Sequence, residues 1–277
     1  MRQNFFSTFR EDRMINRVLC ILFMSTFVWA DCNEGEVDLG WGNCNDFYGN
    51  HSDGCMSSGC YSIEQTTVID LDYQQLTGGI SPEIGNLINL TLLSLESNSQ
   101  LAGEIPSEIG NLTNLTELRF KNCSLTGEIP SELGNLTNLD FFSLYDNELT
   151  GEIPSELGNL TNTTYFDLAT NNLTGEIPPE IGNLNLALVS LSNNQLSGVI
   201  PPSVCNTNGI HVSDNQLCPP YPECISDSHI ESQDTTNCEE QPLCDEETEV
   251  ELWGECYNIA TTIYLDLENN QLTGEIP

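Results

Sequence analysis

Basic residues are nearly missing from this chain. Only 6 lysine and arginine residues stand against 42 aspartate and glutamate residues, so the formal net charge of the 277 residues is −36. Four of the six arginine and lysine residues lie at or before Arg17, which leaves Arg119 and Lys121 for the rest of the chain. Nucleic acids, anionic membranes and acidic polysaccharides are bound through basic patches. The composition therefore excludes these classes of partner.

Catalytic signatures are missing as well. The three histidines, His51, His211 and His229, are scattered, and none lies in a known motif with a Ser or Cys nucleophile. The sequence has no glycine-rich phosphate loop, metal-binding helix or nucleophile elbow. Carboxylates are too frequent for any pair to stand out as acid and base. We predict that the chain is not an enzyme and needs no cofactor or metal.

Long apolar runs are also missing after residue 30. Before it, Arg13 and Arg17 precede a short apolar run, 18–24, and Val28-Trp29-Ala30 offers a small-residue cleavage site. This pattern predicts a secretory signal peptide over residues 1–30, too short to span a membrane. We expect a mature chain that begins near Asp31 and is secreted, either extracellular or at the cell surface, without membrane insertion.

The most prominent feature of the sequence is a repeated motif. A glycine recurs at intervals of 23 to 25 residues, at Gly78, Gly103, Gly127, Gly151, Gly175 and Gly198. A fixed period in this range, combined with L-x-x-L-x-L-x-x-N, is typical of leucine-rich repeats. Each repeat is expected to contribute one coil to a solenoid, because neighbouring repeats bury each other's apolar side chains.

Within each repeat, apolar residues alternate with outward residues, which predicts a short strand with two inward side chains. The inward pairs are Ile69/Leu71, Leu93/Leu95, Leu118/Phe120, Phe142/Leu144, Phe166/Leu168, Val189/Leu191 and Ile210/Val212. Three residues later stands a residue expected to satisfy buried backbone groups: Asn98, Asn147, Asn171, Asn194 and Asn215. In the third repeat Cys123 takes this place, and we interpret it as a small buried residue.

The run Leu-Thr-Gly-Glu-Ile-Pro, followed by Gly-Asn-Leu-Thr-Asn-Leu, resembles the plant-type leucine-rich repeat of receptor ectodomains and polygalacturonase inhibitors, and secreted bacterial proteins carry similar arrays. The resemblance covers about residues 68–217. It implies an α/β-type solenoid: a right-handed horseshoe with a parallel sheet on its concave face, a mostly irregular convex side with short 3-10 turns, and a concave surface that recognises protein, peptide or glycan.

Ten cysteines lie outside both the signal peptide and the Cys123 position. An even number in a secreted chain predicts disulfides that close the ends of the array. Zinc is the alternative, but no paired C-x-x-C spacing supports it. The expected caps are a cysteine-rich N-terminal segment, 31–67, and a C-terminal cap with linker, 218–243, on either side of about seven repeats, 68–217.

The sequence pattern of the N-terminal cap occurs twice in the chain. Cys32–Cys44 and Cys244–Cys256 each enclose 12 residue steps and an acidic-Val-acidic-Leu run followed by Trp-Gly, and each is followed by related Tyr-x-Ile and Thr-Thr residues. We therefore expect residues 244–277 to form a second N-terminal cap and the first repeat of a second array, continued beyond Pro277.

The candidate binding surface lies where the two remaining basic residues fall. Arg119 and Lys121 occupy outward strand positions, and the neighbouring outward positions include Phe141, Tyr145 and Tyr165. Outward aromatic residues beside arginine are typical of binding hot spots. The alternative is local neutralisation, in which the two cations offset nearby acidic residues. The acidic residues concerned are Glu96, Glu117 and Asp167.

Acidic residues also recur along the flank of the predicted solenoid. One row is Glu104, Glu128, Glu152 and Glu176, and a second is Glu108, Glu132 and Glu156. Calcium bridging is conceivable for such rows, although no loop of calcium-binding spacing is present.

These features favour a secreted recognition or adhesion module that binds an extracellular protein, peptide or neutral glycan on its concave face. Two alternatives remain open: a non-catalytic targeting segment of a larger secreted enzyme, and an inhibitor of an extracellular hydrolase.

Overall fold

The computed structural model describes residues 36–39, 60–238, 249–252 and 255–258. The predicted signal peptide, most of the N-terminal cap and the end of the predicted second cap lie outside these residues. The chain divides into two compact units, 1–234 and 235–277. The four segment boundaries proposed from the sequence remain a prediction.

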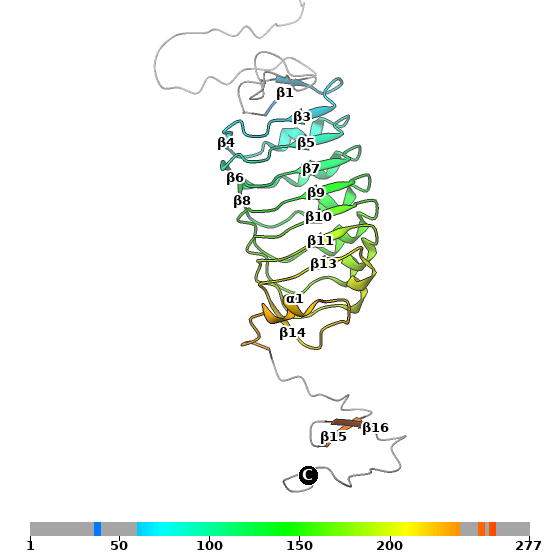
Figure 1. Ribbon diagram of the computed structural model, residues 1–277. Coiled ribbons are helices and arrows are strands. Elements are labelled where there is room, and N and C mark those ends of the chain that lie inside the picture. Colours follow the sequence, from blue (N-terminus) through cyan, green and yellow to red (C-terminus); the bar gives the residue numbers. More distant parts are fainter. Residues whose placement is uncertain (1–35, 40–59, 239–248, 253–254, 259–277) are drawn as a thin grey trace, which may run out of the picture. The chain divides into compact units, whose positions relative to one another are not determined.

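Seven short parallel strands form one sheet, with one strand from each successive coil of the first unit (Figure 1). The strands are β3 (Val68–Asp70), β5 (Leu92–Ser94), β7 (Glu117–Arg119), β9 (Phe141–Ser143), β10 (Tyr165–Asp167), β11 (Leu188–Ser190) and β13 (Ile210–His211). The inward pairs predicted from the alternation are all buried in one continuous apolar core. The predicted solenoid with a parallel sheet is confirmed. We call the outward side of this sheet the concave face.

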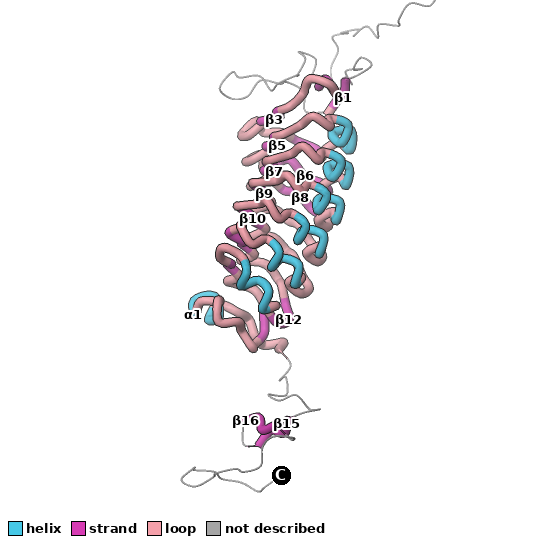
Figure 2. Tube along the Cα trace, turned by 90° about the vertical axis from the view of Figure 1, so that its right-hand side faces the viewer, coloured by secondary structure: helices cyan, strands magenta, loops and turns pink. Residues whose placement is uncertain are grey.

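Short 3-10 helices stack in a row on the side of the coils away from this sheet (Figure 2). They are η1 (Pro82–Asn86), η2 (Ser107–Asn111), η3 (Ser131–Asn135), η4 (Ser155–Asn159), η5 (Pro179–Asn183) and η6 (Pro202–Asn206). A proline at the N-cap of η2 to η6, extended with ψ near 130°, starts each helix. The expected 3-10 turns of the convex side are thus present.

A second row of parallel strands was not predicted. It consists of β4 (Thr77–Gly78), β6 (Gln100–Glu104) and β8 (Ser124–Thr126), together with a separate pair, β12 (Ser197–Val199) and β14 (Gln216–Cys218). The glycines of the repeat lie here with positive φ, for example 77° at Gly127. The sequence indicated irregular chain, because the backbone pairing between coils depends on their stacking and leaves little trace in the side-chain pattern.

The repeated asparagines form a ladder inside the coils. Asn171 is typical: its Oδ1 accepts a hydrogen bond from the backbone N–H of Leu149 at 3.1 Å, and its Nδ2 donates to the carbonyls of Leu144 and Leu168 at 3.0 and 3.1 Å. Equivalent bonds are made by Asn98, Asn147, Asn194 and Asn215. The ladder satisfies buried backbone groups of two adjacent coils at once.

Cys123 interrupts the ladder where the preceding coil has one extra residue. Two residues separate Asn98 from Leu101, and the N–H of Leu101 donates to the backbone carbonyl of Asn98 at 2.8 Å. No side-chain acceptor is then needed in the next coil, and the free, buried Cys123 donates its S–H to the carbonyl of Leu95 at 3.2 Å. Burial raises the pKa of this thiol to about 11, which fits a structural rather than a reactive cysteine.

The C-terminal end of the array is closed by chain that continues the ladder. Helix α1 (Asp227–Glu231) is followed by Gln233, whose Oε1 accepts from the N–H of Leu217 at 3.1 Å and whose Nε2 donates to the carbonyl of Val212 at 2.9 Å. Gln233 therefore makes the bonds that an asparagine makes in a coil.

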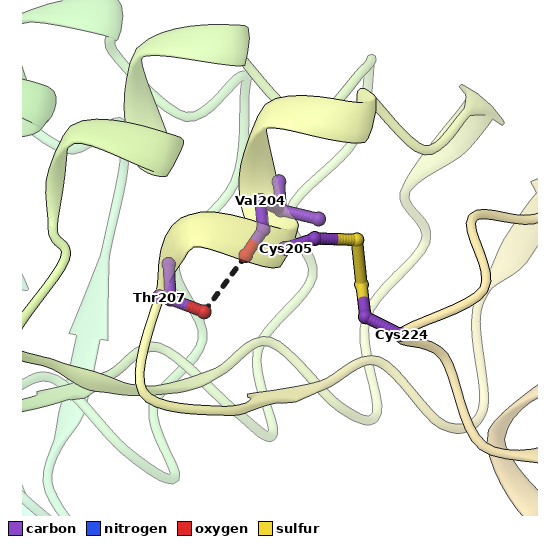
Figure 3. The surroundings of a disulfide bond; sticks show 4 residues. All are labelled: Val204, Cys205, Thr207 and Cys224. Carbon is purple, nitrogen blue, oxygen red and sulfur yellow. Dashed lines mark hydrogen bonds between the residues drawn. A yellow bond between two sulfur atoms is a disulfide. The ribbon is translucent and has the colours of Figure 1, made fainter.

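Disulfides hold the cap as expected. Cys205 on η6 is joined to Cys224 of the cap segment (Figure 3). Cys60, Cys218 and Cys238 are also disulfide-bonded.

Two antiparallel strand pairs share one register. In the first unit β1 (Glu36–Asp38) pairs with β2 (Cys60–Ser62), placing Val37 opposite Tyr61 and Asp38 opposite Cys60. In the second unit β15 (Glu249–Leu252) pairs with β16 (Glu255–Asn258), placing Val250 opposite Tyr257 and Glu251 opposite Cys256. This correspondence aligns Cys256 with Cys60, whereas the spacing in the sequence aligned it with Cys44. It supports the proposal that the second unit repeats the N-terminal cap.

Candidate functional site on the concave face

Outward side chains of the seven-stranded sheet form columns that cross the coils. The first column holds Val68, Leu92, Glu117, Phe141, Tyr165 and Leu188, which are paired in register from strand to strand. The second column holds Asp70, Ser94, Arg119, Ser143, Asp167, Ser190 and His211. The third column lies two residues after the end of each strand. It holds Asp72, Glu96, Lys121, Tyr145, Ala169, Ser192 and Ser213. Successive coils therefore bring residues about 24 positions apart into contact.

The five predicted site residues come together in the middle of this face. The Arg119 guanidinium carbon lies 4.1 Å from the centroid of the Phe141 ring. On the other side of Phe141, the Tyr165 ring is stacked at 4.6 Å with an interplanar angle of 12°. Lys121 Nζ lies 5.4 Å from the centroid of the Tyr145 ring. We call Arg119, Lys121, Phe141, Tyr145 and Tyr165 the central patch.

The two cations of the central patch differ in their partners. Arg119 Nη2 lies 2.6 Å from Glu117 Oε2, and its Nη1 lies 4.0 Å from Glu96 Oε1. Its Nε also donates to Glu117 at 2.8 Å. Lys121 makes no ion pair with any residue that the structure describes. The neutralisation expected from the sequence therefore involves Arg119 with Glu117 and Glu96.

Asp167 is stabilised differently from the way the sequence suggested. Its Oδ2 accepts a hydrogen bond from the Tyr165 hydroxyl at 2.8 Å, and its Oδ1 accepts from the N–H of Ala169 at 3.0 Å. The expected offset of its charge by Arg119 or Lys121 is not among the ion pairs of the described residues. Burial and the bond to Asp167 raise the pKa of Tyr165 to about 12, so this phenol stays protonated.

Carboxylates gather at the N-terminal end of the concave face. Burial raises the pKa of Asp72, and burial followed by repulsion from Asp72 raises the pKa of Glu96. Asp72 Oδ1 accepts from Ser94 Oγ at 2.6 Å and from the N–H of Glu96 at 2.7 Å. The next residue, Tyr73, is 62% exposed, more than any other large apolar side chain of the described residues. This end of the face is thus acidic, and an exposed tyrosine directly follows Asp72 in the chain.

Two of the histidines that looked scattered in the sequence lie together. The ring centroids of His211, on β13, and His229, on α1, are 5.2 Å apart. His229 Nδ1 is buried and has no hydrogen-bond partner among the residues that the structure describes. Burial first, and then His211, lower the pKa of His229. The contact was not foreseen because it depends on how the cap folds back on the last coil.

We expect acid to weaken the docking of this cap. The pKa of His229 is lower in the folded state than its ordinary value of 6.5, so the unfolded chain binds the proton first and stability falls as pH drops below 6.5 toward the folded pKa. Melting temperatures between pH 7.5 and 5.5 would measure this effect. His229→Gln removes the titrating group and should flatten the profile, and an unchanged profile would contradict this explanation.

The flank of the coils carries the predicted rows of exposed glutamates. Each glutamate of the first row packs its side chain over the glycine of the next coil: a Cβ at Gly151 would lie 2.8 Å from Glu128 Cγ. Between the two rows runs a groove of about 1550 Å³, lined by the Ile-Pro-Ser-Glu segments of successive coils. No three His, Cys, Asp or Glu side chains of the described residues are placed to hold a metal ion.

Comparison with protein families identifies the family of this chain. A family model described as the leucine-rich repeat domain of the EGF-like domain-containing protein ComC matches residues 65–217, more than half of the chain. The chain belongs to this leucine-rich repeat family. Curated proteins gave no match. In the described part of this leucine-rich repeat protein, no helix has the length and apolar character needed to cross a bilayer.

Solved structures similar to this chain include a plant peptide hormone receptor and the PEPR1–AtPEP1 structure. The plant peptide hormone receptor RGFR1 in complex with RGF2 is 40% identical, with a TM-score of 0.55, over 57% of this chain and 26% of the receptor. The PEPR1–AtPEP1 structure is 31% identical, with a TM-score of 0.56, over 70% of this chain and 26% of its own. A plant ice-binding protein is 34% identical, with a TM-score of 0.50, over 60% of this chain and 54% of the ice-binding protein. The chain spans about a quarter of the RGFR1 and PEPR1 chains.

Proposed function

We propose that this leucine-rich repeat protein is an extracellular recognition module that binds an extended peptide, or an extended segment of a protein, across its concave face at the central patch. The observation that supports this most is the arrangement of cations and aromatic rings from three successive coils on the outward side of one sheet, which no other described element covers. The sheet and the buried ladder hold these side chains in place before binding, which lowers the ordering cost of association.

A peptide suits the central patch better than a sugar ring does. Stacking on a sugar needs a free aromatic face, whereas Phe141 has Arg119 on one side and Tyr165 on the other. An extended peptide can instead contact the ring edges, the Lys121 ammonium, and the serine hydroxyls of the last two coils. These serines are Ser190, Ser192 and Ser213. RGFR1, described as a plant peptide hormone receptor in complex with RGF2, has a similar structure and 40% identity to this chain. Disulfides such as Cys205–Cys224 are typical of exported proteins.

The two cations are proposed to have different roles. Arg119 is engaged with Glu117, Glu96 and Phe141, so it mainly stabilises the face itself. Lys121 is without an ion pair in the described chain and is half-buried, so its charge is available to a ligand carboxylate.

A substitution pair tests this division. Peptides are first selected on the full chain from a randomised display library, and dissociation constants are then measured by calorimetry for Lys121→Gln and Arg119→Gln. We expect Lys121→Gln to weaken binding about tenfold with an unchanged melting temperature, as for the loss of one charge-assisted contact. Arg119→Gln should lower the melting temperature, because Glu96 and Glu117 lose their partner.

Glu128→Gln on the flank is the matched control and should leave both quantities unchanged. If Lys121→Gln binds the selected peptides as well as the wild-type chain does, the central patch is not the binding site. Failure to select any peptide on the folded chain would refute the proposed function. A neutral-glycan array on the same protein covers the other partner class expected from the sequence.

A further inference from the structure

The charged side chains of the concave face are concentrated at the N-terminal end of the array. In the three columns of outward side chains, the first three coils carry Asp70, Asp72, Glu96 and Glu117 together with both cations, whereas the remaining four coils carry one carboxylate, the buried and hydrogen-bonded Asp167. Asp146 and Asp214 directly follow the third column, as Tyr73 does, and lie outside these columns. The whole chain is acidic, so acidic residues by themselves would not distinguish this surface. Their confinement to one end of the concave face does.

We propose that the ligand of this face is an extended peptide with a basic residue and an acidic residue about three positions apart, lying with its basic residue over Asp72 and Glu96 and its acidic residue at Lys121. This inference rests on the proposed function and adds the charge pattern and the placement of the ligand.

The first step is that the carboxylates at the N-terminal end of the face are incompletely paired with positive charge. Glu96 is 4.0 Å from Arg119, while Glu117 holds the same guanidinium at 2.6 Å. Asp72 has hydrogen bonds to Ser94 and to the Glu96 backbone, and no ion pair in the described chain. Burial raises the pKa of both carboxyl groups, despite the opposing influence of the hydrogen bonds and of Arg119 on Asp72, and of Arg119 and Lys121 on Glu96. A ligand cation would offset this cost directly.

The second step is that an exposed tyrosine directly follows one of these carboxylates in the chain. Tyr73 follows Asp72, and its N–H donates to the carbonyl of Glu96 at 2.9 Å. Its side chain is 62% exposed. A lysine or arginine side chain of a ligand packs well against an exposed ring while its charge faces carboxylates.

The third step is the distance between the two ends. Asp72, Glu96 and Lys121 follow one another in the same column, linked by backbone hydrogen bonds between Tyr73 and Glu96 and between Ser97 and Lys121. Adjacent strands are about 4.8 Å apart, so Asp72 and Lys121 are separated by roughly 10 Å. An extended peptide in the polyproline II conformation covers this distance in about three residues, at about 3.1 Å each, and presents residues three positions apart on the same side.

The test uses the same display library on the full chain, with the selected sequences as the readout. On the wild-type protein we expect enrichment of sequences with Lys or Arg about three positions from Asp or Glu. On the double variant Asp72→Asn, Glu96→Gln, the basic preference should vanish while the acidic preference remains. Lys121→Gln should do the reverse. For one selected peptide, the double variant should raise the dissociation constant about tenfold.

Glu128→Gln serves as the control for net charge, and melting temperatures verify that each variant is folded. Asp72→Asn retains the acceptor oxygen for Ser94 and Glu96, so it is expected to fold. Enriched binders without the charge pair, or a basic preference that persists in the double variant, would overturn this inference and leave the proposed function standing. A folded wild-type chain that selects no peptide would overturn both.

Discussion

Gly110→Ala is expected to destabilise the repeat array by about 3 kcal/mol. A Cβ at this position would lie 2.5 Å from the backbone carbonyl oxygen of Glu132 in the next coil and 2.7 Å from its Cβ. The obstacle is backbone, which cannot rotate away, so the stacked helices η2 and η3 would have to separate. Overpacking of this kind costs about 1–3 kcal/mol, and more where nothing can move. Denaturant unfolding followed by far-UV circular dichroism would measure the loss.

The expected sign is opposite to that of an ordinary glycine replacement. Gly110 does not have positive φ, and glycine to alanine at a compatible position stabilises by about 0.4–1 kcal/mol. Gly79→Ala is the matched control: its added Cβ would lie 3.5 Å from the carbonyl oxygen of Ala102, an ordinary contact. If Gly110→Ala is no worse than Gly79→Ala, close stacking of the 3-10 helices does not limit the array.

Asn171→Ala is expected to cost about 3 kcal/mol. The substitution leaves the buried N–H of Leu149 without its acceptor and removes the three bonds that Asn171 Nδ2 donates to backbone carbonyls. Leu144 and Leu168 retain bonds from Asn147 and Asn194, so the orphaned N–H is the largest part of the loss. An unsatisfied buried donor costs about 1–3 kcal/mol, and each lost bond adds about 1 kcal/mol or less. Denaturant unfolding gives the value.

Cys123→Ala provides the comparison within the same row of the fold. It removes a single S–H donor to the carbonyl of Leu95, which still accepts from Asn98 at 2.8 Å. The N–H of Leu101 keeps its backbone acceptor. We expect a loss of about 1 kcal/mol or less. Equal losses for Asn171→Ala and Cys123→Ala would mean that the ladder bonds contribute little beyond filling space.

Much of the array could be predicted because the repeat imposes its period on every level. Alternating inward residues such as Leu118 and Phe120 identify the strand, and the recurring asparagine identifies the buried turn. Stacking in register followed from the constant repeat length, and it brought Arg119 beside Phe141 and Lys121 beside Tyr145, as expected.

Other features depended on single departures from the repeat. The extra residue before Leu101 changes which acceptor its N–H finds, and this explains a cysteine in the ladder. Gln233 closes the ladder from a segment outside the repeats. The His211 and His229 rings meet because the cap folds back on the last coil. None of these contacts is periodic, so no repeat consensus could indicate them.

The sequence by itself determined the coil, the direction of its side chains and the strongly acidic character of the chain, because these follow from local alternation and composition. Only the tertiary structure decided how the charges of the concave face are shared. Which carboxylate takes Arg119, and whether Lys121 is left without an ion pair, depend on distances of a few ångströms between side chains from different coils, where the Coulomb energy changes steeply.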